Sequence, residues 1–228
     1  MSMRTEAGRI AAVAWKDLMT EWRTKANFNA VVFLAVLTLL LFGFALGPDT
    51  NALRAAAAGV IWLTILFSGV LAFNRSYQLE LEHGALEALL LYPGSHKSLY
   101  LGKLLANLAF VLMVELVTVP LAAVLYDLPL LGPLGGLALV LFLGTVGFVA
   151  LGTFYAAMAS RIRAREVLLP LLLFPMLVPV IVAAVEATSA LLSGDAMGDA
   201  GSWMRLLFVF DVVFVTASVL AFEHVIGE

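Results

Sequence analysis

Four acidic side chains stand inside long apolar stretches of this sequence, where ionisable groups are rare. Glu115 and Asp211 lie well inside their stretches, whereas Glu186 and Glu223 lie nearer the ends of theirs. A charge at the centre of a bilayer costs about 2.5–3.5 kcal/mol on insertion scales, so such groups normally face protein or water. These four residues are therefore the first candidates for a polar intramembrane site.

The sequence offers few partners for these acids. No lysine or arginine lies centrally in the same stretches. Protonation, a polar subunit interface or a hydroxyl such as Thr118 or Thr216 would satisfy a carboxyl group there. We expect Glu115 to make a hydrogen bond between packed helices, with a role in a transport path as the alternative, and Asp211 and Glu223 to be structural or interfacial.

Motifs of several common chemistries are missing. The sequence has no cysteine, which excludes disulfides, thiolate metal sites and thiol catalysis. It has no G-x-x-x-x-G-K-[ST] run, so it cannot bind ATP through a P-loop of its own. If the chain belongs to an ATP-driven machine, the motor is a separate subunit, and this chain is not an enzyme.

The elements that hold these residues are apolar runs long enough to cross a bilayer. Of the 228 residues 63% are hydrophobic and 13% charged, against about 45–50% and about 25% in soluble domains. A span needs about 20 apolar residues. Six runs qualify, at about 28–46, 52–73, 101–126, 132–158, 167–190 and 203–225. We predict an all-α integral membrane protein, one domain over 1–228 with six transmembrane helices.

Basic residues are distributed unequally between the two sides of this topology. Of the 13 lysines and arginines, only Arg54 and Arg205 fall on the side away from the N-terminus. Because basic residues near span ends are retained in the cytoplasm, we expect both termini to be cytoplasmic.

Haem ligands are scarce on the outer side of this topology. The three histidines, His83, His96 and His224, all fall on or near the cytoplasmic side. Met197 and Met204 could reach the outer face, but methionine in an apolar chain more often serves packing. We therefore expect the chain itself to bind no haem and no metal ion.

Residues 1–26 precede the first span and form a predicted amphipathic helix. At 100° per residue, one stripe holds Ala11, Trp15, Leu18 and Trp22, with basic residues on the far side. Such a stripe suits a helix lying in the headgroup plane of the membrane. The alternative is a cytoplasmic cap packed on the bundle.

The loop after the second span carries a further predicted helix, over residues 79–93. Glu80, His83 and Glu87 would share one face, and the leucines would lie on the opposite half. A short acidic helix held between two spans suits docking into a cleft of a cytoplasmic partner, and a solvated helix without a partner is the alternative. The candidate coupling residues are Glu80, Glu82, His83, Gly84, Leu86, Glu87, Leu90 and Pro93.

The fifth run, 167–190, contains Pro170, Pro175 and Pro179. Each removes a backbone donor, so we expect a kinked or locally open helix. Such a bend could serve gating, or it could fit the helix around a dimer interface.

Several short segments along the chain carry a resemblance to a known family through their order and spacing. In chain order they are residues 22–23 (WR), 58–62 (AGVIW), 82–93 with HGALE at 83–87, Lys103, 143–145 (LGT) and 175–179 (PMLVP). Together they resemble the type-2 ABC-transporter permeases, and within them the CcmB family, the B subunits of the haem exporter of cytochrome c maturation. The family usually has an acidic residue where this chain has His83, which implies a differently tuned docking surface.

The resemblance implies a permease subunit in the bacterial inner membrane that pairs with a second copy of itself. Its other expected partners are an ATPase subunit (CcmA-like), a haem-handling membrane subunit (CcmC-like), a small single-span subunit (CcmD-like) and a haem chaperone (CcmE-like). ATP hydrolysis in the motor would move the 79–93 element, and the spans would pass that motion to the partner that releases haem-loaded chaperone. Haem would be handled by the complex.

Two other functions fit parts of the pattern. A type-2 permease that exports a drug, lipid or glycan would share the loop signature but not the family-specific segments. A motor-independent secondary transporter would have broken helices in matching halves of the chain. The prolines of 167–190 have no counterpart in 52–73, which argues against the secondary transporter.

Overall fold

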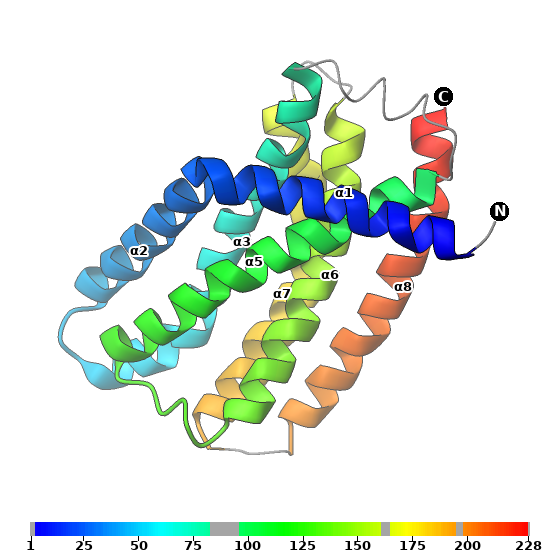
Figure 1. The fold of residues 1–228 in the computed structure, drawn as a ribbon. Coiled ribbons are helices and arrows are strands. Elements are labelled where there is room, and N and C mark those ends of the chain that lie inside the picture. The colour runs from blue at the N-terminus through cyan, green and yellow to red at the C-terminus, as the bar shows by residue number, and fades with distance from the viewer. Residues whose placement is uncertain (1–2, 83–95, 161–164, 195–197, 228) are drawn as a thin grey trace.

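The computed structural model describes residues 3–82, 96–160, 165–194 and 198–227, and this part of the chain contains helices and no strand (Figure 1). The helices are α1 (Met3–Thr24), α2 (Ala26–Leu46), α3 (Thr50–Glu82), α5 (His96–Tyr126), α6 (Leu134–Ser160), α7 (Arg165–Leu192) and α8 (Ala200–Gly227). All except α1 contain a stretch long and apolar enough to cross a membrane. The predicted all-α class with six membrane-spanning helices is confirmed.

One helix is much longer than its predicted span. The second predicted span ended at residue 73, but α3 continues to Glu82, because residues 74–82 contain neither glycine nor proline to end a helix. The predicted 79–93 element therefore begins as the last turn of α3. The rest of that element, from 83, lies outside the described residues.

Short turns connect the helices at the end of the bundle opposite the two termini (Figure 1). Gly47 ends α2 with a positive φ of 73°, which glycine adopts without strain. Asp49 Oδ1 then accepts a hydrogen bond from the Asn51 backbone N–H at 2.9 Å, which caps the start of α3. Arg54 pairs with the Asp127 carboxylate and donates to the Asp127 carbonyl oxygen at 2.8 Å, so the start of α3 is joined to the end of α5.

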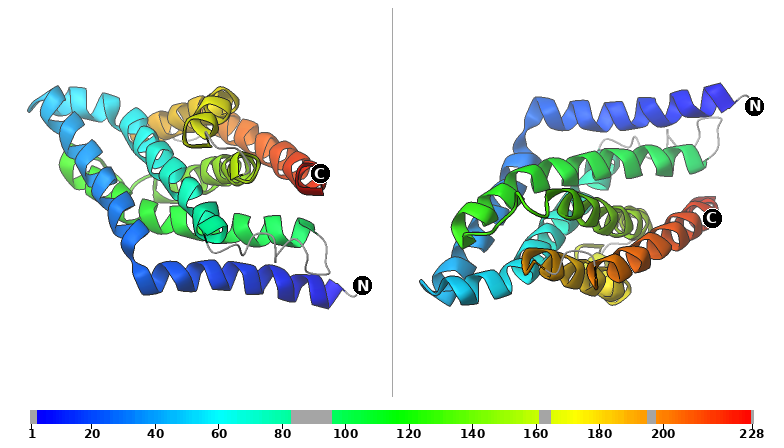
Figure 2. Two further views of the ribbon diagram at one scale, coloured as in Figure 1. Left: turned by 90° about the horizontal axis from the view of Figure 1, so that it is seen from above. Right: turned by 90° about the horizontal axis from the view of Figure 1, so that it is seen from below.

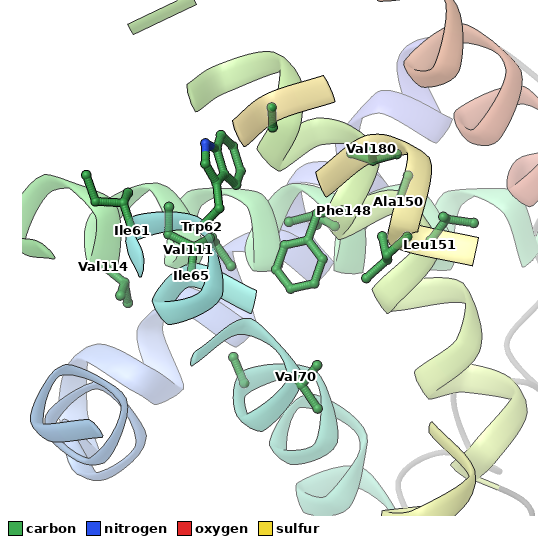
Figure 3. Packing of buried hydrophobic residues seen from close by; sticks show 14 of the residues in the cluster. Ile61, Trp62, Ile65, Val70, Val111, Val114, Phe148, Ala150, Leu151 and Val180 are labelled. Carbon is green, nitrogen blue, oxygen red and sulfur yellow. The ribbon is translucent and has the colours of Figure 1, made fainter. Parts of the chain in front are cut away.

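Helix α6 lies in the middle of the bundle, in contact with α3, α5, α7 and α8 (Figure 2). Gly144 permits the close approach of α3, since a Cβ atom there would lie 2.3 Å from the Trp62 ring. Trp62 is fully buried, and its Nε1–H donates to Thr188 Oγ1 on α7 at 2.9 Å. Trp62, seen in Figure 3 among the buried aliphatic side chains, therefore holds α3, α6 and α7 together.

Helix α7 runs without interruption from Arg165 to Leu192 across Pro170, Pro175 and Pro179. The prolines thus stay within a helix rather than opening a break in it. Whether they bend α7 for gating or for an interface stays a prediction. A fourth proline, Pro120 inside α5, was not singled out from the sequence.

Candidate functional site

A buried lysine joins three helices near the base of the loop between α3 and α5. Lys103, in the second turn of α5, has no exposed surface. Its Nζ lies 3.1 Å from the Asp17 carboxylate on α1 and donates to the Ser76 carbonyl oxygen on α3 at 2.9 Å. Because a buried ammonium is stable only when paired and hydrogen-bonded, these contacts fix α1 and the end of α3 against α5.

The neighbouring Gly102 shows how closely α1 lies on α5. A Cβ atom at Gly102 would come within 2.6 Å of Val13 Cβ and 3.0 Å of the Ile10 carbonyl oxygen. Only a residue without a side chain permits this approach. Helix α1 is therefore docked along the first turns of α5, which Figure 2 shows as two neighbouring helices.

The opposite face of α1 points away from the bundle. Trp15 and Trp22 are 64% and 67% exposed, and Ala11 is exposed beside them. Three of the four residues of the predicted stripe are thus presented outward, whereas Leu18 is half-buried, and the face with Val13 and Asp17 contacts the bundle. Helix α1 is packed on the bundle through one face, and its place in the headgroup plane stays a prediction.

The contacts of Lys103 with Asp17 and Ser76 form the Lys103 junction. The predicted coupling residues flank this junction along the chain. Glu80 and Glu82 belong to the last turn of α3. Glu80 follows Ser76 by four residues, about one helical turn. The remaining six lie outside the described residues: His83, Gly84, Leu86, Glu87, Leu90 and Pro93. The described chain resumes at His96, seven residues before Lys103. The chain thus leaves and re-enters the bundle close to the Lys103 contacts.

Of the intramembrane acids, Glu115 has the best-defined partner. Its side chain is buried between α5 and α6, and Thr145 Oγ1 on α6 donates to its carboxyl oxygen Oε1. Thr118, proposed from the sequence as a partner, instead donates to the Glu115 backbone carbonyl oxygen at 3.5 Å. The other proposed hydroxyl, Thr216, is exposed. The expected interhelical hydrogen bond is present, but with a different threonine.

Two further polar contacts join α5 to α6, both nearer the start of α5 than Glu115 is. Asn107 Nδ2 donates to Thr153 Oγ1 at 2.9 Å, and the Tyr100 hydroxyl donates to the Ala150 carbonyl oxygen at 3.0 Å. All of these side chains are buried. A row of polar contacts therefore runs along the α5–α6 interface from the loop base to mid-bundle.

Asp211 occupies the other side of α6. Its side chain is 6% exposed and lies close to Gly147 on α6. A Cβ atom added at Gly147 would lie 2.7 Å from Asp211 Oδ1. It makes no well-formed side-chain hydrogen bond among the described residues. Thr145 and Gly147 are two positions apart, about 200° around the helix, so Glu115 and Asp211 flank α6 at one level.

The other two acids do not join this arrangement. Glu186 is exposed on α7, and Glu223 lies in the last turns of α8, where its side chain is not described. No cluster of three or more potential metal ligands occurs in the described ranges. In the described residues the helices are packed and hydrogen-bonded, and the base of the loop between α3 and α5 is strongly connected, which suits the transmission of movement.

The sequence also matches known proteins. A family model described as "CcmB protein" matches residues 9–227. The chain is 33% identical over 177 residues to "Heme exporter protein B" of Rhodobacter capsulatus, covering 77% of this chain and 80% of that protein. Over 179 residues it is 32% identical to the protein of that name from Paracoccus denitrificans, with 77% and 80% covered. It is 31% identical over 166 residues to "Heme exporter protein B" of Pseudomonas aeruginosa, covering 73% of this chain and 74% of that protein.

Proposed function

The chain belongs to the CcmB family, and on that premise we propose that it is the permease subunit of an ABC-type haem exporter in c-type cytochrome biogenesis. Six membrane-spanning helices without a nucleotide-binding motif suit a permease subunit whose ATPase is a separate chain. Residues 79–93 would be the element on which that ATPase acts. The chain itself would perform no catalysis.

The observation that carries this proposal is the Lys103 junction. The ATPase would push on a segment whose two ends belong to α3 and α5, and Lys103 connects both of these helices to α1. A displacement of the segment would therefore move three helices together instead of bending one. Closely packed interiors transmit such displacements because they are not easily compressed.

The proposed partners follow from the family. The complex would contain a second copy of this chain and an ATPase subunit, together with a haem-handling membrane subunit, a small single-span subunit and a haem chaperone. The termini would be cytoplasmic and the membrane the bacterial inner membrane. Haem would be cargo of the complex, and this chain would contribute no ligand to it.

Deletion and complementation test the proposal. A strain of the source organism that lacks this chain should lose covalently haem-bearing c-type cytochromes, detected by haem-dependent peroxidase staining, and a plasmid copy should restore them. Normal c-type cytochromes in the deletion strain, with altered drug tolerance or altered envelope lipid or glycan, would favour a type-2 permease for another substrate.

The orientation predicts opposite sidedness for two reporter positions. The N- and C-termini lie at the same end of the bundle (Figure 1), the end that carries most of the basic residues. Because such residues are retained in the cytoplasm, alkaline phosphatase fused at the C-terminus should be inactive, and inserted at residue 198 it should be active. An active C-terminal fusion would contradict the six-span orientation.

Haem titration of the purified chain alone tests whether this chain itself provides a haem ligand. Met204 is half-buried in α8, and Met197 lies outside the described residues. Since neither position is accompanied by a histidine on the same side, we expect no sharp low-spin haem spectrum. A defined spectrum that Met204→Leu or Met197→Leu removes would assign a haem ligand to this chain.

A further inference from the structure

A pocket of about 340 Å³ opens where α1 meets α2 and α5. Figure 1 shows the corner between α1 and α2. Its volume falls within the range of about 300–1,000 Å³ that is usual for ligand sites. One wall is apolar and consists of Leu18, Phe28 and Met113. The Phe28 ring is held edge-to-face against Phe110 on α5, with 6.1 Å between centroids, so the wall is supported from behind.

The rest of the lining is polar and carries both signs of charge. Glu21, Lys25 and Asn29 line the pocket together with Trp22. Glu21 Oε1 accepts a hydrogen bond from the Phe28 backbone N–H at 2.7 Å, which holds the carboxylate in place. The Lys25 ammonium lies 5.8 Å from the centre of the Trp22 ring, and within the described residues Lys25 and Glu21 form no ion pair with each other. An acid and a base are thus both available to a ligand.

The backbone at Lys25 indicates that the lysine side chain has a role. Lys25 has a φ of 52°, in the left-handed region that costs most residues about 1–2 kcal/mol. Glycine or asparagine would make the same corner more cheaply. The corner alone therefore gives no reason for a lysine at this position, whereas an ammonium at the pocket mouth does.

The surroundings of the pocket are those of an acyl-chain environment. Of the 21 residues of α2, only Val31, Ala35 and Leu39 are buried, and apolar side chains such as Phe33 and Leu37 are exposed. Helices α2 and α5 are long and apolar enough to span the membrane, which would place this face beside lipid tails, and the charged residues lie where α1 meets the start of α2. A ligand that fills the pocket must combine a polar head with an apolar chain.

We propose that the corner pocket binds a phospholipid with an amine-bearing zwitterionic headgroup, of the phosphatidylethanolamine type. The phosphate oxygens would accept hydrogen bonds from the Lys25 ammonium, the headgroup ammonium would donate to Glu21, and the first methylenes would cover the apolar wall. A purely anionic headgroup would place negative charge beside Glu21. A quaternary amine could not donate a hydrogen bond to it.

Native mass spectrometry of the full chain tests this assignment. The chain is purified in detergent and mixed with equal amounts of dioleoyl phosphatidylethanolamine, phosphatidylglycerol and phosphatidylcholine, and the lipid retained is identified. We expect preferential retention of phosphatidylethanolamine, and a decrease of about tenfold in Lys25→Asn, the loss expected when a charge-assisted hydrogen bond is removed. Glu21→Gln keeps an oxygen for the Phe28 N–H but should abolish the preference over phosphatidylglycerol.

The control is Arg23→Asn, which removes the same charge from an exposed position outside the pocket lining and should leave retention unchanged. Asparagine tolerates the backbone of Lys25, so the Tm of Lys25→Asn should not fall. Unchanged retention in Lys25→Asn, an equal loss in Arg23→Asn or preferential binding of phosphatidylglycerol by the unmodified chain would overturn the proposal. So would a loss of dimer in Lys25→Asn with lipid retention unchanged, which would assign the pocket to a protein contact.

Discussion

Replacing Glu87 by lysine should block cytochrome c maturation and remove the ATPase subunit from the complex while the helical bundle stays folded. In the proposed complex Glu87 would dock into the ATPase, lose its water and require a basic or hydrogen-bonding partner. Breaking a desolvated charge pair at an interface costs about 2–5 kcal/mol of association, enough to lower ATPase recovery strongly. The measurement is co-purification of the ATPase with the tagged permease, together with the c-type cytochrome content.

The control for Glu87→Lys is the same reversal at Glu228, the C-terminal residue. A charge in water contributes at most about 1 kcal/mol. We expect Glu228 to be such a charge, so Glu228→Lys should leave ATPase recovery and maturation near normal. Both variants must be compared at equal abundance in the membrane. Equal ATPase recovery and normal maturation with Glu87→Lys would mean that residues 79–93 are not the coupling element.

Replacing Lys103 by methionine should have a different effect: the ATPase should still bind, but maturation should fail. Methionine removes the ammonium that connects Asp17 of α1 to the Ser76 carbonyl oxygen of α3. Removing one partner of a buried ion pair costs about 3–5 kcal/mol. In the variant, Asp17 would still be 18% exposed and would still have the Lys16 ammonium 3.1 Å away. We therefore expect the free energy of unfolding to fall by about 3 kcal/mol, the lower end of that range. The measurement is the Tm of the detergent-solubilised chain.

The matched control for Lys103→Met is Arg54→Met at the opposite end of the bundle. Arg54 also pairs with a carboxylate, that of Asp127, but the two side chains are 48% and 73% exposed. An exposed pair contributes at most about 1 kcal/mol, so Arg54→Met should lower the Tm little and leave maturation intact. Equal effects of the two substitutions, or loss of the ATPase in Lys103→Met, would contradict the role given to the Lys103 junction.

The membrane-spanning helices could be predicted from the sequence because each one depends only on its own residues. A long apolar run between charged turns is a local signal, and the six runs correspond to α2, α3, α5, α6, α7 and α8. The predicted span 52–73 agrees with the apolar part of α3, Thr50–Asn74, and the helix itself continues beyond the span to Glu82. The charged residues after 73 indicate where the helix leaves the membrane, but they do not end the helix, and residues 74–82 contain neither of the strongest helix breakers, glycine and proline.

The pairing of polar residues between helices could not be predicted in the same way. That Glu115 bonds to Thr145 and not to Thr118 depends on how α5 and α6 are rotated toward each other, which the apolar pattern of a membrane helix leaves open. The pair of Asp17 and Lys103 was missed although each gave a local signal. Asp17 stands among basic and apolar residues in α1, and Lys103 lies within the apolar start of a span.

The position of Trp62 gives the protein a built-in optical probe. Its indole has no exposed surface and donates its N–H to Thr188, whereas Trp15 and Trp22 on α1 are largely exposed. A collisional quencher in the water or in the lipid would extinguish the emission of the two α1 tryptophans first. Trp203 on α8 is half-buried and would add to the remaining emission, so in a Trp203→Phe variant that emission would report on Trp62 at the contact between α3, α6 and α7. Fluorescence recorded during ATP turnover would then distinguish a helix sliding on the membrane surface from a rearrangement of the bundle interior without any attached dye.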